Sequence, residues 1–196
     1  MADKMLCYKC EQGASGTGCT RVGVCGKQPK TAALQDLLTH AIKGLALFSV
    51  EARKVSAFDT EIGAFINEAL FSTLTNVDFD DDRFLVLIRK SVDYRDKLKE
   101  KVKAAGGKTD FTYDAATFKL APEKAGMIEQ GLSRGFKADS DDPDIVSLKH
   151  TLLFGLRGVA AYADHAHLLG KDDEAIYQFI AEALAATLSH DFSLDD

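Results

Sequence analysis

The sequence predicts an all-α protein in which a loop rich in cysteine and glycine precedes two related helical units. Three observations predict this class. Apolar residues recur at steps of three and four along most of the chain, which is the spacing of one helix face. No segment shows the alternation of apolar and polar residues that is typical of a half-buried strand. A long stretch also recurs later in the chain, which indicates a duplicated unit.

Residues 1–30 are predicted to form a loop rather than a regular element. They contain Gly13, Gly16, Gly18, Gly23 and Gly26. Glycine permits the positive φ angles and the close backbone approaches that a tight loop needs. Five Lys or Arg side chains against two carboxylates give this stretch a charge of +3, whereas the whole chain carries −6. We therefore expect a loop that wraps around a compact, anionic object.

Helical patterns begin at Pro29, which suits the first position of a helix because its missing N–H has no intrahelical partner there. A second helix is predicted at about 60–74 and a third at about 82–105. Acidic residues at 78–82 suit the start of the third helix, where carboxylates cap free N–H groups. The first helix carries an apolar face formed by Leu34, Leu37, Leu38, Ile42, Leu45 and Phe48.

An internal repeat places residues 34–82 on residues 148–196 without a gap. Of these 49 positions 16 are identical, whereas average residue usage predicts roughly three. Lys43 aligns with Arg157, and Phe48 with Tyr162. Shared Leu and Ala alone would not explain the match. The identical positions in the first copy are Leu34, Leu38, Gly44, Ala46, Ala52, Asp59, Ile62, Phe65, Ile66, Glu68, Ala69, Leu70, Thr73, Leu74, Asp81 and Asp82.

The two copies differ in length, because the second reaches residue 196 where a third helix would begin. We expect two three-helix units, the second lacking its last helix, with boundaries at 1–30, 31–107 and 108–196 in one compact domain. Uncovered apolar surface is then expected on the second unit. Segment 109–135 or a second chain could cover it. The residues expected to be uncovered are Leu152, Leu156, Phe179 or Leu184.

The four cysteines follow the pattern C-x2-C-x8-C-x5-C, as Cys7, Cys10, Cys19 and Cys25. Structural zinc sites usually combine two short knuckles with gaps of two to four residues, and only the first pair here fits. Four thiolates in a glycine-rich loop suit a [4Fe–4S] or [2Fe–2S] cluster. A four-cysteine zinc site and disulfide or thiol chemistry remain alternatives.

Composition excludes several classes of protein. The net charge of −6 argues against a general nucleic-acid binder, and no apolar run is long enough for a membrane span. The N-terminus has no apolar signal region, so we expect a cytoplasmic protein. Crowded cysteines in that compartment are more often metal ligands than disulfides.

The five histidines show no spacing typical of a metal site. His165 and His167 lie two apart and so face different directions on a helix; surface positions are expected for both. His40, His150 and His190 are scattered along the sequence and show no partner pattern.

The stretch CYKCEQGASGTGCTRVGVCGKQPKTAALQDLL at 7–38 resembles the N-terminus of the hybrid cluster proteins, also called prismane proteins or hydroxylamine reductases. The similarity continues in LFSTLTNVDFDDDRF at 70–84, LLFGLRGVAAYADHAHLLG at 152–170 and EALAATL at 182–188. It covers essentially the whole chain.

This resemblance implies that the four cysteines ligate the proximal cluster of the family. Members with this shorter spacing hold a [4Fe–4S] cubane, and the longer-spaced enteric type holds [2Fe–2S]. The family's N-terminal domain consists of two three-helix bundles. Its catalytic Fe–S–O hybrid cluster, which reduces hydroxylamine or nitric oxide, takes ligands from later domains. No cysteine follows Cys25, so this chain alone is expected to be inactive.

The implied function is an oxidoreductase's electron-transfer domain, which passes electrons to a catalytic cluster held elsewhere. A non-redox structural or interaction domain, in which the four cysteines hold zinc, is the alternative. Expected partners are an electron donor and either the remaining domains of the parent reductase or a self-associating copy. Lys9, Arg21 and Lys27 are expected to raise the cluster's potential, because cations favour its more negative reduced form.

Overall fold

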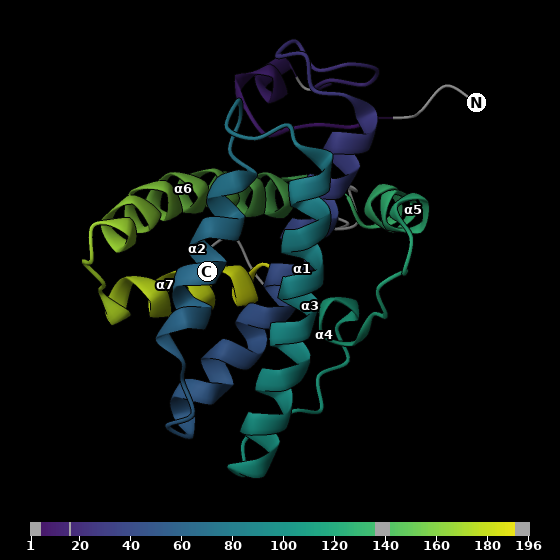
Figure 1. The fold of residues 1–196 in the computed structure, drawn as a ribbon. Helices are drawn as coiled ribbons and strands as arrows, with labels where there is room; N and C mark the ends of the chain where they lie inside the picture. The colour runs from purple at the N-terminus through teal and green to yellow at the C-terminus, as the bar shows by residue number, and fades with distance from the viewer. Residues whose placement is uncertain (1–4, 16, 136–141, 191–196) are drawn as a thin grey trace.

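The computed structural model describes residues 5–15, 17–135 and 142–190 (Figure 1). Within these ranges the chain forms helices and no named strand, which confirms the all-α class. Gly16 and the end of the second repeat at 191–196 lie outside the described residues. The elements are a 3-10 helix η1 (Glu11–Ser15) and the α-helices α1 (Pro29–Lys54), α2 (Thr60–Ser72), α3 (Asp81–Ala104), α4 (Asp114–Thr117), α5 (Lys124–Arg134), α6 (Pro143–Leu168) and α7 (Glu174–Ala186).

Helix α1 forms the centre of the molecule. It packs against α2, α3, α4, α5 and α7, and this surrounds it with apolar side chains. All six residues of its predicted apolar face are 0% exposed. Even Gln35 and Ser49 on α1 are almost completely buried. The cysteine loop therefore leads directly into a helix, α1, that is packed on nearly all sides.

Aspartates begin four of the helices and satisfy N–H groups that have no intrahelical acceptor. Asp80 accepts hydrogen bonds from the backbone N–H groups of Asp82 and Arg83 at 2.9 and 3.3 Å. This confirms that the acidic run at 78–82 caps a helix. Asp59, Asp142 and Asp173 cap α2, α6 and α7 in the same way.

The helix boundaries repeat at the interval of 114 residues that relates the two sequence copies. Helices α1 and α6 each have 26 residues and begin with proline. Helices α2 and α7 each have 13 residues. After each of the latter, a threonine hydroxyl donates to the carbonyl oxygen three residues before it: Thr73 to Leu70 at 2.7 Å and Thr187 to Leu184 at 2.6 Å. The two copies therefore share their helix lengths and C-terminal caps.

Segment 109–135, which could have covered the second unit, packs on α1 instead. Helices α4 and α5 both contact α1 and lie beside α1 and α3 in Figure 1. The end of α5 also comes near α6, since Arg134 and Lys149 line the same cavity. A Cβ on Gly44 would lie 1.9 Å from the carbonyl oxygen of Ala115, and one on Gly131 would lie 2.0 Å from that of Ala33. Glycine thus permits the close approach of both short helices to α1.

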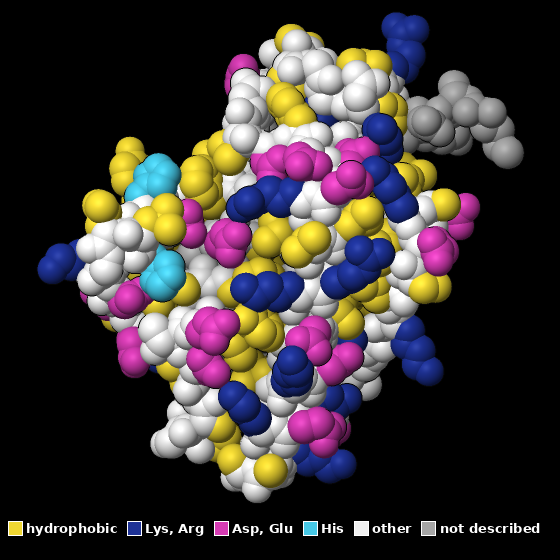
Figure 2. Space-filling view, in the orientation of Figure 1, with side chains coloured by type: hydrophobic (Ala, Val, Ile, Leu, Met, Phe, Trp, Pro, Cys, Tyr) yellow, Lys and Arg dark blue, Asp and Glu magenta, His cyan; other side chains and the backbone are white. Residues whose placement is uncertain are grey.

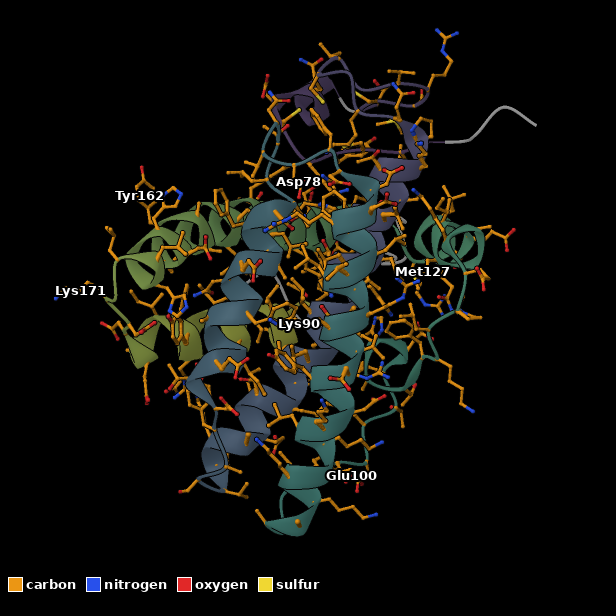
Figure 3. All side chains as sticks on the ribbon, in the orientation of Figure 1. Asp78, Lys90, Glu100, Met127, Tyr162 and Lys171 are labelled. Carbon is orange, nitrogen blue, oxygen red and sulfur yellow. The ribbon has the colours of Figure 1, made fainter. Side chains whose placement is uncertain are left out.

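The expected uncovered surface is partly confirmed. Phe179 on α7 is 53% exposed, as predicted. The same prediction was wrong for Leu156 and Leu184, which are almost completely buried because they join the core formed with α1 and α2. Other exposed apolar side chains mark this unit, including Tyr162, which projects from α6 (Figure 3). In Figure 2 apolar groups surround the histidines at the edge formed by α6 and α7.

Candidate metal centre

The cysteine loop lies over the N-terminal end of α1 (Figure 1). Cys7 and Cys19 lie side by side, because the backbone N–H of each donates to the carbonyl oxygen of the other at 3.0 Å. Gly18 precedes Cys19 with a φ of 60°, and a Cβ there would lie 2.5 Å from the Cys7 carbonyl oxygen. Only glycine fits this position without strain.

Cys10 and Cys25 lie in two further turns of the loop. Cys10 precedes η1, and its carbonyl oxygen accepts a hydrogen bond from the N–H of Gly13 at 2.9 Å. Around Cys25, the N–H of Gly26 donates to the Gly23 carbonyl oxygen at 2.8 Å. A Cβ on Gly23 would lie 3.1 Å from the Cys25 sulfur. The backbone thus approaches this sulfur closely, as we expected of the loop glycines.

All four cysteines are free thiols. Cys7 is buried, Cys10 and Cys19 are half-buried, and Cys25 is exposed. Among the residues that the structure describes, no three Cys, His, Asp or Glu side chains are grouped to hold a single metal ion.

Lys27 is the most unusual side chain beside the loop, because it is only 1% exposed. Its ammonium donates to Gln35 Oε1 at 2.6 Å, and no described carboxylate forms an ion pair with it. Burial lowers the pKa of Lys27, and nearby Lys9 lowers it further, whereas the thiolates of Cys7 and Cys25 raise it. A buried ammonium requires compensating negative charge. The loop fits an anionic thiolate centre, whose charge would supply this compensation.

The other cations expected near the cysteines differ in their surroundings. Lys9 is 7% exposed and forms an ion pair with Asp36 of α1, whereas Arg21 is exposed to solvent. The structure adds Arg157 of α6, which sequence reasoning missed. Arg157 is 4% exposed. Burial lowers its pKa to about 10, whereas the negative charges of Asp36 and then of the Cys7 thiolate raise it. Its isolated charge within the apolar sequence LLFGLRGVAAYA was the available signal.

The structure shows where the five histidines lie. His165 and His167 are exposed, as predicted. His40, His150 and His190, which are scattered along the sequence, all line one cavity of about 230 Å³. The cavity lies between α1, α6 and the segment after α7. These segments are far apart in the sequence, so spacing along the chain cannot predict that their side chains share a cavity.

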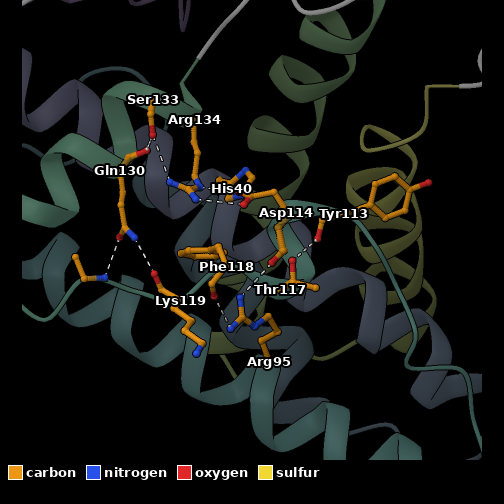
Figure 4. A network of polar contacts seen from close by, with 12 residues as sticks. His40, Arg95, Tyr113, Asp114, Thr117, Phe118, Lys119, Gln130, Ser133 and Arg134 are labelled. Carbon is orange, nitrogen blue, oxygen red and sulfur yellow. Dashed lines mark hydrogen bonds and ion pairs between the residues drawn. The ribbon is translucent and has the colours of Figure 1, made fainter.

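A polar network joins His40 to the short helices α4 and α5 (Figure 4). His40 Nε2 lies 2.8 Å from Asp114 Oδ2, and Arg134 Nε donates to the same oxygen at 2.6 Å. The hydrogen bond from Arg134 holds the pKa of Asp114 below its ordinary value. Burial outweighs the attraction of Asp114 and lowers the pKa of His40 to about 4. The imidazole is therefore neutral at pH 7.

A second part of the network fixes α4 against α3. The Arg95 guanidinium is buried and donates to the carbonyl oxygens of Ala115 and Phe118 at 3.2 and 3.1 Å. Ala115 belongs to the four-residue helix α4 and Phe118 is its C-cap, so neither carbonyl has an acceptor role inside a longer helix. In the part of the chain that the structure describes, no helix combines the length and the apolar character needed to cross a membrane.

Comparison with known proteins agrees with the resemblance seen in the sequence. Residues 5–195 match the family model described as Prismane/CO dehydrogenase family. A hydroxylamine reductase of Syntrophobacter fumaroxidans is 61% identical over 193 residues, which are 98% of this chain and 36% of that protein. The hydroxylamine reductase of Methanocella arvoryzae is 50% identical, with 98% and 36% covered. That of Geobacter metallireducens is 40% identical, with 93% and 34% covered.

The chain therefore spans about a third of the length of these curated relatives. Proteins of this family bind iron–sulfur clusters. The match extends from the cysteine loop through both helical units. The chain belongs to the Prismane/CO dehydrogenase family.

Proposed function

We propose that this chain is the iron–sulfur electron-transfer domain of a hydroxylamine-reductase-like protein. Cys7, Cys10, Cys19 and Cys25 would bind one [4Fe–4S] cluster, as implied by the family resemblance. The observation that carries the proposal is the buried ammonium of Lys27, which lies near thiols and has no carboxylate partner among the described residues. Four thiolates around a cluster would supply negative charge where the fold has buried this cation.

When bound, such a cluster supplies one-electron transfer. The side chains around the cluster would influence its reduction potential. Lys9 and Lys27 place positive charge in a poorly hydrated environment, where it acts more strongly than in water. Arg157 adds a third buried cation near Cys7. Cationic groups and burial both act on the potential of a cluster.

The activity of the longer protein is part of the same proposal. Its relatives are named hydroxylamine reductase and are about three times as long. We propose that electrons pass from this domain to a catalytic hybrid cluster that reduces hydroxylamine or nitric oxide. Ligands for that cluster would come from other parts of the protein, since no cysteine follows Cys25 here. The 196-residue chain is expected to show no hydroxylamine turnover alone.

Anaerobic expression followed by metal analysis and EPR tests the cluster assignment. We expect about four irons per chain, visible absorption and a reducible S = 1/2 signal, as is typical of a cubane with four thiolate ligands. One zinc per chain without visible absorption would instead support the structural zinc alternative. Two irons per chain would favour [2Fe–2S].

Replacing Lys27 by methionine is expected to make the cluster potential more negative. The change keeps an unbranched apolar side chain but removes the buried charge that favours the reduced form. A shift on the order of 50 mV is expected, which corresponds to roughly a tenfold change in the equilibrium for one electron. Redox titration followed by EPR measures it.

Lys30→Met is the matched control, because the Lys30 side chain is 55% exposed and pairs with Asp81. Water and salt screen its charge, so its shift should be much smaller. Equal potentials in Lys27→Met and the unmodified chain, at equal iron content, would contradict the role of the buried ammonium.

The exposed apolar face of α6 and α7 supports a proposal about partners. Phe65 in the first copy is 3% exposed and packs edge-on against Tyr94 of α3, with ring centroids 5.1 Å apart. Its repeat equivalent Phe179 is 53% exposed. Likewise Phe48 is fully buried, whereas its equivalent Tyr162 is 81% exposed. We propose that a helix patterned like α3, from a further part of the longer protein, covers this face.

Exposed apolar area of this kind promotes association. The isolated chain is therefore expected to bind a hydrophobic dye and to self-associate in light-scattering measurements. The double substitution Tyr162→Ser and Phe179→Ser should reduce both signals. A compact monomer with little dye binding would contradict the proposed docking face.

A further inference from the structure

The cavity of about 230 Å³ beside the cysteine loop contains an unusual excess of positive charge. It lies between residues 6–9, helices α1 and α6, and the segment that follows α7. Asp36 contributes the one carboxylate among its described lining residues, and Lys9 already pairs with this group. The cationic lining residues are Lys9, Lys43, Arg134, Lys149 and Arg157.

Arg157 provides the strongest evidence that the cavity is built to receive an acceptor. The residue is 4% exposed, and its Nε donates to Thr73 Oγ1 at 2.9 Å. This bond fixes the guanidinium in the cavity wall. Within the described part of the chain, its two terminal nitrogens have no acceptor. Arg157 lines the cavity, and its terminal nitrogens are not among the fully buried atoms without a partner. Water or the oxygen atoms of a ligand can therefore reach these donors.

Lys43 brings a second cation to the same place. It occupies the position in the first repeat that Arg157 occupies in the second, and both line the cavity. Burial lowers the pKa of Lys43 to about 8, and Arg157 and Lys149 act in the same direction, whereas Asp36 raises it. No described carboxylate forms an ion pair with Lys43. Like charges that converge out of water favour binding of an anion between them.

The remaining lining groups suit a polar ligand of small size. His150 and His40 are neutral at pH 7, because burial lowers the pKa of each to about 4. Both rings therefore add no charge to the site. Nε2 of His40 already faces Asp114, so in the neutral ring Nδ1 can only accept, from a protonated oxygen of the ligand. Planar guanidinium groups bind oxyanions through two parallel hydrogen bonds. The volume excludes a dinucleotide-sized ligand but accommodates a small oxyanion with water.

We propose that this cavity is a binding site for a small, multiply charged oxyanion, held by the guanidinium of Arg157 and the ammonium of Lys43. None of the four cysteines lines the cavity, although Arg157 also lies near Cys7. The proposal does not depend on the identity of the metal that the cysteines bind. It adds a ligand to the domain beside the proposed electron-transfer centre.

Titration with inorganic phosphate at constant ionic strength tests the proposal on the anaerobically purified 196-residue chain. Calorimetry should show saturable binding. In histidine-selective NMR spectra, the ring signals of His150 and His40 should shift with the same saturation curve. The ring of His165, which is exposed and does not line the cavity, is the internal reference and should not shift.

Arg157→Gln and Lys43→Met should each weaken phosphate binding at least tenfold, which is the usual size of a charged hydrogen bond. If Arg157→Gln does not fold, Lys43→Met still tests the site, because Lys43 makes no hydrogen bond to a described residue that its replacement would break. Lys171→Gln, an exposed change in the α6–α7 connection, should bind like the unmodified chain. Absence of saturable binding, as expected if protein carboxylates fill the cavity, overturns the proposal. Equal binding by all variants does so as well.

Discussion

Cys19→Ser is expected to remove most of the bound iron and the visible absorption of the protein. Serine oxygen is a poor substitute for a thiolate, which is the ligand that iron–sulfur clusters require. Cys19 is also held beside Cys7 by two backbone hydrogen bonds. The loop therefore brings no other described cysteine sulfur into its place. Iron analysis and absorption spectra of the anaerobically purified variant measure the loss.

Thr20→Ser is a suitable control for this experiment. Thr20 is the exposed neighbour of Cys19, and the substitution preserves the backbone carbonyl that accepts from the N–H of Met5. Its iron content should equal that of the unmodified chain. Full iron content in Cys19→Ser would show that the assignment of this loop as the cluster site is wrong.

Gly44→Ala is expected to lower the free energy of unfolding by about 3 kcal/mol. The added Cβ would lie 1.9 Å from the carbonyl oxygen of Ala115, so α1 and α4 would have to separate. Arg95 opposes this movement, because its guanidinium holds the same carbonyl oxygen from α3. Since small domains have only about 5–15 kcal/mol of stability, the loss should be evident in the midpoint of urea unfolding.

Gly158 provides a matched control within the same chain. It is the repeat equivalent of Gly44, in the middle of α6, but a Cβ there would meet nothing within 4 Å among the described residues. Alanine is a better helix former than glycine, so Gly158→Ala should stabilise the protein by about 0.5–1 kcal/mol. Equal unfolding midpoints for the two variants would contradict the packing seen at Gly44.

This pair shows what residue patterns can and cannot predict. The repeat correctly aligned the two glycines, and the helices that contain them begin 114 residues apart and have equal length. The alignment could not show that α4 approaches one glycine and leaves the other open. Helix periodicity and caps act over three or four residues. The approach of α4 depends on chain folding over about 70 residues.

The residues of the candidate site also fall into two groups: those that a sequence pattern predicts, and those that only folding brings together. Spacing identified the four cysteines, and local charge identified Lys9, Lys27 and Arg21, but only folding decided that Arg21 stays in solvent. Three histidines without sequence pattern line one cavity. Arg157 reaches the neighbourhood of Cys7 although the two residues are 150 positions apart. No local rule connects such residues.

The sequence by itself determined the all-α class, the first three helices and the family to which the chain belongs. Each of these depends on short-range spacing or on a motif that can be read along the chain. The tertiary structure alone decided which cations lose their water, where segment 109–135 packs and which apolar residues of the second unit, such as Leu156 and Leu184, are covered. The physical reason is that burial depends on which helices pack together. The hydration of a side chain and its interactions with other charges change only when that packing forms.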